Sequence, residues 1–270
     1  MISKQVFVTG SAGTIGRIIV RALIARGHRV RGFDRVANPE LADQRLATIT
    51  DLAALHEAMA GCQVVIHLAG TPEEADFVTQ LVPNNVIGPY HVLEAARAAK
   101  VERVIIASSI RVGKMNDWDA QVVRVSDGLA PHDLYSFTKA ANEVMGEMYA
   151  RLYGMTVVCA RLGWVVRNPD EVKTVREKKW HSGILLSHDD VARFLVGSSE
   201  NELHFPTATR FSAMFVASKP METAAVDVTE ARDVTGFEPQ DVWPNGSPWV
   251  NLKTAMDRTQ SPREPEQRKT

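Results

Sequence analysis

The chain of 270 residues is 45% hydrophobic, enough to bury a full core, and we expect one domain with an appended lobe. A net charge of −1 and a pI near 6.7, with no basic stripe, argue against nucleic acid or an anionic membrane as partner. No apolar stretch approaches the roughly 20 residues that span a bilayer. The first residues read as a strand rather than a signal peptide, which predicts a cytoplasmic location.

The first apolar run, Val6–Val8, predicts a buried strand that leads directly into a loop with three glycines. Residues Thr14–Arg26 then place apolar side chains at helical spacing, and Gly27 ends the pattern. A strand, a glycine turn and a helix N-terminus present backbone N–H groups and the positive dipole end to a pyrophosphate. We therefore predict dinucleotide contacts from Gly10, Gly13, Thr14, Ile15 and Gly16.

The second predicted strand, Arg29–Phe33, ends in Asp34, which follows Gly16 by 18 residues. In folds of this kind an acidic side chain at this point hydrogen-bonds the adenosine ribose, and it would repel a 2′-phosphate. Asp34 therefore favours NAD over NADP, although the neighbouring Arg35 could bind a phosphate.

Two further strands are expected over Leu46–Thr50 and Val64–Leu68, with a helix between them. The second of these ends in a corner of small residues that lets backbone approach a ligand at the carboxyl end of a parallel sheet. Additional cofactor contacts are predicted from Asp51, Leu52, Leu68, Ala69 and Gly70.

The same alternation continues with a helix over Pro83–Ala99, a strand over Val101–Ala107, a helix over Tyr135–Tyr153 and a strand over Met155–Val166. The strand before the long helix delivers Ser108 and Ser109 at its carboxyl end. Alternating strands and helices predict an α/β fold with a right-handed, doubly wound parallel sheet, the Rossmann architecture.

Shorter segments follow: helices near Asp170–Lys179, after Ser187 and near Thr229–Thr235, and a strand around Phe211–Ala217. Ser187 with Asp190 reads as a capping box. We expect residues 1–166 to form the dinucleotide-binding core and residues 167–258 a small substrate-binding lobe. Residues 259–270 have the composition of a disordered tail.

Tyr135 and Lys139 give the strongest indication of chemistry. On a helix, positions i and i+4 share one face, so the ammonium can favour the phenolate. The phenol could then exchange a proton as a hydroxyl is oxidised or a carbonyl reduced. Cys62 and Cys159 read as inert core thiols, and the eight histidines show no ligand spacing, so no metal site is predicted.

In this order, the motifs resemble the extended short-chain dehydrogenase/reductases, specifically the NAD-dependent epimerase/dehydratase family, over residues 4 to about 240. Arg161-Leu162-Gly163 and Ser187-His188-Asp189-Asp190 look like its uronate dehydrogenase branch. The resemblance implies a catalytic triad of serine, tyrosine and lysine. In that triad Tyr135 is the acid/base, and Lys139 lowers its pKa and holds the nicotinamide ribose.

The resemblance also implies a triad serine that orients the substrate oxygen. Alignment from the strand selects Ser109, whereas counting back from Gly113 selects Ser108. We take Ser109 as the catalytic serine.

The chain departs from the uronate branch at Ile110-Arg111, where that branch has Asn-His, and at Trp164, where it has serine. The branch binds its substrate carboxylate with an arginine from the loop after the sixth strand. Lys173 or Arg176 could do the same, or could lie on a solvated charged helix. Arg111 could contact substrate or form a surface salt bridge. The candidate substrate residues are Thr71, Ser109, Arg111, Trp164, Lys173 and Arg176.

The segment between the sixth strand and the tail is small for a lobe that encloses a nucleotide-sugar. We therefore predict hydride transfer between nicotinamide and a free sugar acid or other small polyol. A sugar epimerase would begin with the same step, and a non-catalytic NAD-sensing regulator would share the fold but has no need of the Tyr–Lys pair. Excess apolar residues on Pro83–Ala99 and Tyr135–Tyr153, through which family members pair, predict a homodimer.

Overall fold

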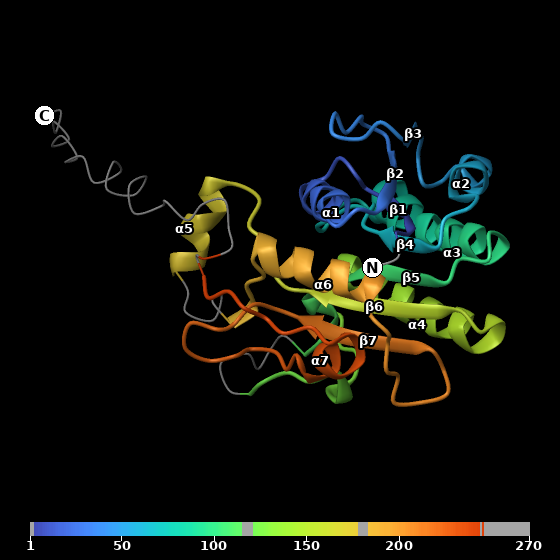
Figure 1. The fold of residues 1–270 in the computed structure, drawn as a ribbon. Coiled ribbons are helices and arrows are strands. Elements are labelled where there is room, and N and C mark those ends of the chain that lie inside the picture. Colours follow the sequence, from blue (N-terminus) through green and yellow to red (C-terminus); the bar gives the residue numbers. More distant parts are fainter. Residues whose placement is uncertain (1–2, 115–120, 178–182, 244, 246–270) are drawn as a thin grey trace, which may run out of the picture.

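The computed structural model describes residues 3–114, 121–177, 183–243 and 245. The described chain forms a seven-stranded parallel sheet in the order β3-β2-β1-β4-β5-β6-β7 (Figure 1). The strands are β1 (Gln5–Thr9), β2 (Arg29–Asp34), β3 (Gln44–Leu46), β4 (Val64–His67), β5 (Arg103–Ser109), β6 (Thr156–Leu162) and β7 (Phe211–Val216). The predicted doubly wound α/β fold is confirmed.

Helices connect the strands and cover both faces of the sheet (Figure 1). They are α1 (Thr14–Ala25), α2 (Leu52–Met59), a π-helix (Phe77–Ile87), α3 (Gly88–Ala98), α4 (Leu134–Tyr153), α5 (Pro169–Glu177), α6 (His188–Glu200) and α7 (Thr229–Thr235). Ser187 caps α6 by accepting a hydrogen bond from the Asp190 N–H at 2.8 Å, which is one half of the predicted capping box. The other half is not formed, because the Ser187 N–H donates to Ser218 instead of the Asp190 carboxylate.

Alternation along each strand divides the core into two layers. Val6 and Val8 of β1 pack with α1, α6 and α7, whereas Phe7 between them packs with α2, α3 and α4. Successive side chains of a strand point to opposite faces, so a strand covered on both sides is apolar throughout. This explains why the central strands β1 and β4 read as short continuous apolar runs.

Three predicted boundaries are wrong. Pro83 does not begin a helix but lies inside the π-helix, which starts beside Asp76, whose side chain accepts from the Thr79 N–H. Proline often marks the first turn of a helix because it has no backbone N–H to donate. Here the wider turns of the π-helix accommodate it in the interior of the helix, so it does not mark the start. The third strand covers Gln44–Leu46 rather than Leu46–Thr50, and the sixth ends at Leu162 rather than Val166.

Residues beyond 166 contribute to the sheet itself. β7 pairs with β6, and α6 packs against α1 in the same helical layer. Two smaller apolar clusters, around Phe215 and around Val172, lie beside the carboxyl ends of the last strands. The division at residue 166 stays a prediction, and the tail at 259–270 lies outside the described residues.

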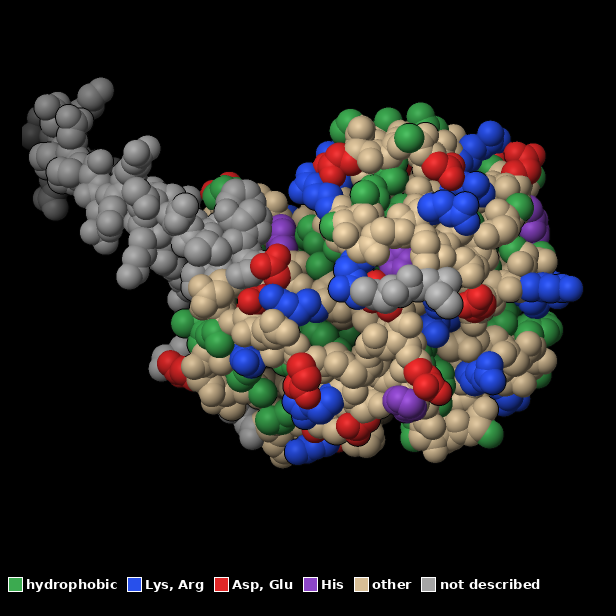
Figure 2. Space-filling view, viewed as in Figure 1, with side chains coloured by type: hydrophobic (Ala, Val, Ile, Leu, Met, Phe, Trp, Pro, Cys, Tyr) green, Lys and Arg blue, Asp and Glu red, His purple; other side chains and the backbone are tan. Residues whose placement is uncertain are grey.

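The two cysteines are buried and unpaired, as predicted, and burial raises the pKa of both thiols, that of Cys62 to about 11. No helix within the described ranges is long and apolar enough to cross a bilayer. The same ranges hold no group of three or more potential metal ligands. Figure 2 shows basic and acidic side chains interspersed over one face of the described residues, in agreement with the near-zero net charge.

Candidate active site

A cleft of about 1330 Å³ opens at the carboxyl ends of the strands. It lies where the strand order reverses between β1 and β4, the position at which sheets of this type bind ligands. The cleft brings together the predicted residues Gly10, Gly13, Thr14, Ile15, Gly16, Asp34, Leu68, Ala69, Gly70, Thr71, Ser108, Ser109, Arg111, Tyr135, Lys139 and Trp164.

The glycine loop has no room for side chains at its two ends. Gly10 has φ of +68°, and a Cβ there would lie 2.7 Å from the Ala69 nitrogen. A Cβ on Gly16 would lie 2.0 Å from the Gly10 oxygen. α1 starts directly after Gly13 without a side-chain cap, so its first N–H groups are available to a pyrophosphate.

A buried pair that the sequence analysis missed holds the loop against β4. The Thr9 hydroxyl accepts from the N–H groups of Leu68 and Ala69, both at 3.2 Å, and lies 2.7 Å from His67 Nδ1. Since this hydroxyl already accepts twice, its hydrogen is donated to His67. Burial lowers the pKa of His67 to about 3, so the ring is neutral near pH 7.

Asp34 is fixed at the end of β2 by backbone donors. Its Oδ2 accepts from the Ala12 N–H at 3.0 Å and its Oδ1 from the Val36 N–H at 3.1 Å. Arg35 lines the cleft beside it. The carboxylate is therefore held next to the glycine loop, where the ribose of a dinucleotide would lie.

The structure does not bring Asp51 and Leu52 into the cleft. Asp51 caps α2 by accepting from the Ala54 N–H at 3.0 Å, and Leu52 packs against the apolar layer of α2 and α3. Because β3 ends early, the residues that follow it line the cleft instead: Ala47, Thr48 and Ile49. The predicted cofactor role of Asp51 and Leu52 thus has no support in the cleft lining.

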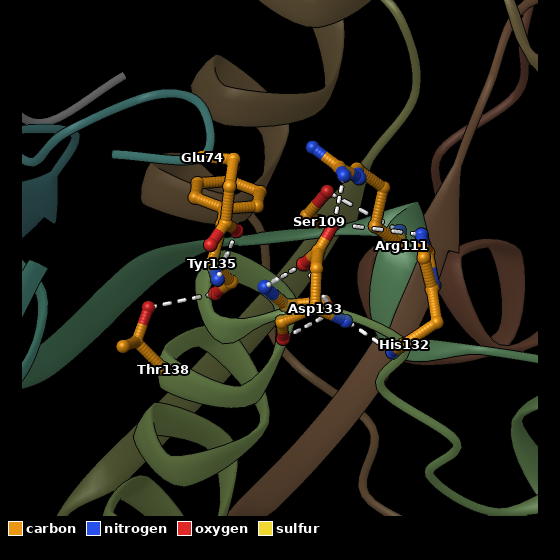
Figure 3. Close-up of polar contacts among 8 residues, drawn as sticks. Glu74, Ser109, Arg111, His132, Asp133, Tyr135 and Thr138 are labelled. Atoms are coloured by element: carbon orange, nitrogen blue, oxygen red, sulfur yellow. Dashed lines mark hydrogen bonds and ion pairs between the residues drawn. The ribbon is translucent and has the colours of Figure 1, made fainter. Parts of the chain in front are cut away.

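Tyr135 and Lys139 lie on the first turns of α4, both buried. The Lys139 ammonium is 5.8 Å from the centre of the Tyr135 ring and donates to the Ala107 carbonyl at 2.9 Å. Ser109, at the end of β5, lies close enough to the Tyr135 phenol to lower its pKa. Figure 3 shows Ser109 and Arg111 beside Tyr135. Serine, tyrosine and lysine therefore meet in one place.

Burial governs the proton affinities of this group. Burial raises the pKa of the Tyr135 phenol. The neighbouring Ser109 hydroxyl and the charge of Arg111 lower this pKa, but by less. Burial also lowers the pKa of Lys139 to about 8. The expectation that the Tyr135 pKa falls is thus wrong for the protein alone, because desolvation of the phenolate outweighs the nearby charges.

The two adjacent serines have different partners. Ser108 donates to Glu143 Oε1 at 2.6 Å, and the Arg161 guanidinium donates to the same carboxylate at 2.9 and 3.0 Å. All three side chains are buried. The Ser108 hydroxyl is therefore engaged by buried partners, whereas Ser109 lies beside Tyr135, and the geometry favours Ser109 as the triad serine.

Of the two alternatives for Arg111, the structure shows the salt bridge, and contact with substrate stays a prediction. Its guanidinium forms an ion pair with Asp133, which caps α4, and also lines the cleft 5.2 Å from the centre of the Tyr135 ring (Figure 3). Trp164 donates from its indole nitrogen to Glu171 at 3.1 Å. The side chains of Lys173 and Arg176, on α5, lie outside what the structure describes.

Among the residues that line the cleft, Asn84, Glu73 and Arg167 were not predicted as site residues, whereas Thr71 was. Thr71 is held by two asparagines of the π-helix: its N–H donates to Asn85 at 2.7 Å, and its hydroxyl accepts from Asn84 at 3.0 Å. Glu73 and Arg167 line the cleft and form an ion pair of 2.6 Å. These contacts join residues that are far apart in the sequence, so they become visible only in the folded structure.

Comparisons with known proteins agree with the site. The sequence pattern of the NAD dependent epimerase/dehydratase family matches residues 6–196. The L-arabinose 1-dehydrogenase (NAD(P)(+)) of Haloferax volcanii is 34% identical over 180 residues, covering 63% of this chain and 70% of that protein. A uronate dehydrogenase of Pseudomonas syringae pv. tomato is 30% identical over 200 residues, covering 71% of this chain and 68% of that protein.

A solved structure shares the fold. It is a variant of the uronate dehydrogenase of Agrobacterium tumefaciens complexed with NAD, with a TM-score of 0.76 and 22% identity. The match covers 98% of this chain and 93% of that chain.

The fold and the cleft define a dinucleotide-dependent enzyme of the Rossmann type. The chain belongs to the NAD-dependent epimerase/dehydratase family. The predicted family, the prediction of an NAD-dependent enzyme and NAD as cofactor are thereby confirmed.

Proposed function

We propose that the protein is an NAD-dependent oxidoreductase that transfers a hydride between nicotinamide and a carbinol carbon of a small sugar or sugar acid. The observation that carries the proposal is the position of the Tyr135 phenol, which shares one cleft with Ser109, Lys139 and the glycine loop. The Haloferax and Pseudomonas relatives, named for L-arabinose and uronate, support a sugar as substrate.

The residues of the cleft fit NAD. The first turn of α1 would hold the pyrophosphate, Asp34 the adenosine ribose and Lys139 the nicotinamide ribose. Bound NAD supplies the hydride acceptor, the nicotinamide C4.

Ser109 would orient the substrate hydroxyl, and Tyr135 as phenolate would remove its proton. Loss of this proton, together with loss of a hydride to bound NAD, would turn the carbinol carbon into a carbonyl carbon. Lys139, with a pKa of about 8, is mostly an ammonium at pH 7 and favours the phenolate.

A spectrophotometric panel tests this function. The purified protein is mixed with NAD and a series of neutral sugars, uronic acids and aldonic acids, and NADH absorbance is followed. Turnover of a free sugar or sugar acid supports the proposal. Interconversion of two sugars without net NADH would instead indicate an epimerase. Tight NAD binding with no reaction on any sugar would favour the sensor alternative.

Cofactor preference is expected to rest on Asp34. Asp34→Ala removes the carboxylate that would bind the ribose and repel a 2′-phosphate, so the preference for NAD over NADP should narrow about tenfold. Calorimetric titration with both cofactors measures it. Asp43→Ala, which breaks an ion pair with Arg31 outside the cleft, serves as control. Tighter binding of NADP than NAD by the parent would contradict the ribose assignment.

The two serines are distinguished by paired substitutions. Ser109→Ala should lower turnover by about 10²–10³-fold, because the substrate oxygen loses a fixed hydrogen-bond partner. Ser108→Ala should mainly lower stability, by about 1–3 kcal/mol, because the buried Glu143 loses a donor. Turnover and thermal melting are measured for both. A larger loss of turnover in Ser108→Ala would reverse the assignment.

We also propose a homodimer. α4 exposes Phe137, Val144, Met148 and Leu152 at helical spacing, and the π-helix exposes Val78 next to them, with the Phe77 and Phe137 rings 6.4 Å apart. A second copy of the chain would cover this stripe. Light scattering at micromolar concentration measures the mass in solution. A mass near 29.8 kDa, that of a single chain, would contradict the proposed dimer. The cytoplasmic location stays a prediction.

A further inference from the structure

An ion pair joins two loops of the cleft. Glu73 follows β4 and Arg167 follows β6, and their side chains meet with 2.6 Å between Glu73 Oε1 and Arg167 Nη2. Both residues line the same cleft as Tyr135. The pair is half-exposed, so substrate entering from solvent can reach it.

A second carboxylate holds the same guanidinium. Glu171 Oε1 lies 2.7 Å from Arg167 Nε, and its Oε2 accepts from the Trp164 indole at 3.1 Å and from the Arg167 N–H at 2.9 Å. Arg167 therefore lies between two carboxylates, and Trp164 fixes the orientation of one of them.

The other guanidinium near Tyr135 is also paired. Arg111 binds Asp133, which in addition caps α4 and lies 3.6 Å from His132. Among the described side chains that line the cleft near Tyr135 or bind those that do, four carboxylates, Glu73, Glu74, Glu171 and Asp133, thus accompany three cations, Arg111, Lys139 and Arg167.

This balance of charge selects between two kinds of sugar. A substrate carboxylate would have to displace Glu73 from Arg167 and then lie beside Glu73 and Glu171, which like charges disfavour. The hydroxyls of a neutral sugar would instead donate to these carboxylates without breaking the ion pair.

We propose, on the basis of the function proposed above, that the substrate is an uncharged sugar and that Glu73 disfavours sugar acids by occupying Arg167. Glu73 is then a specificity-determining residue that acts by repulsion as much as by contact.

Two sugar pairs that differ only at C6 test the inference: D-galactose with D-galacturonate, and D-glucose with D-glucuronate. For the parent, kcat/KM is expected to be at least about tenfold higher for the neutral member of the pair that reacts. Glu73→Gln keeps the size of the side chain but removes its charge, which leaves Arg167 paired with Glu171 alone. It should raise kcat/KM for the acid about tenfold and change that for the neutral sugar by much less.

Two further variants sharpen the test. Arg167→Ala introduced into Glu73→Gln should cancel the gain on the acid, because the cation is gone. Glu40→Gln, in an exposed ion pair with Arg21 outside the cleft, is the matched control and should leave both kcat/KM values unchanged. Equal melting temperatures show that each variant is folded.

The outcomes separate the two proposals. A parent enzyme that oxidises the uronate better than the neutral sugar would overturn the inference and leave the proposed function standing. If Glu73→Gln had the same ratio of kcat/KM for the acid to kcat/KM for the neutral sugar as the parent, the proposed role of Glu73 would be wrong. Absence of hydride transfer from every sugar would instead count against the proposed function itself.

Discussion

Tyr135→Phe is expected to turn over its sugar about 10²–10⁴-fold more slowly than the parent and to bind NAD with nearly unchanged affinity. The substitution removes one oxygen from a ring that is otherwise held by its buried surroundings. Without the hydroxyl no group at this position takes the substrate proton. Steady-state NADH formation gives the turnover, and calorimetry gives the NAD affinity.

Tyr149→Phe provides a matched control for this result. Tyr149 lies on the same helix, is also buried, and donates its hydroxyl hydrogen to Glu94 rather than facing the cleft. Its substitution should leave turnover unchanged. A Tyr135→Phe protein as active as its parent would remove the acid/base assignment.

Lys139→Met is expected to impair both catalysis and cofactor binding. Turnover should fall by about 10²-fold or more because the phenolate loses its neighbouring cation. Hydrogen bonds to charged groups contribute about 1.5–3 kcal/mol, so NAD affinity should fall about 10- to 100-fold. Lys4→Met, whose ion pair with Glu102 lies outside the cleft, is the control.

The pH dependence provides a second signature of Lys139. Burial disfavours the ammonium, so Lys139 loses its proton as the pH rises through about 8, well below the ordinary value for lysine. The kcat/KM for NAD, which reports on the free enzyme, should therefore decline above about pH 8 in the parent. This ionisation should be missing in Lys139→Met, and an unaltered profile in the variant would contradict the assignment.

The parts of the site that were predictable from sequence are those set by local geometry. Gly10 and Gly16 are needed where backbone meets backbone, and Tyr135 and Lys139 share a helix face because they are four residues apart. Each of these constraints acts over a few residues. The alternation of short apolar runs with helical patterns similarly predicted the parallel sheet.

The contacts that sequence reasoning missed join residues far apart in the chain. Thr9 and His67 are 58 residues apart, and nothing about a threonine at the end of a buried strand predicts its partner. The Glu73–Arg167 pair likewise depends on two loops that meet only because β4 and β6 end at the same edge of the sheet. At Pro83 a local signal was overridden, because the π-helix continues through the proline.

The buried Glu143–Arg161 pair has a consequence for how this enzyme can change over evolutionary time. It ties α4 to β6, and through Ser108 to β5, so the chemistry rests on a frame that lies within the core. Glu73 and Arg167 lie instead on loops outside that frame. A lineage can therefore acquire a new sugar preference by a few exchanges in these loops, without rebuilding the machinery that moves the hydride.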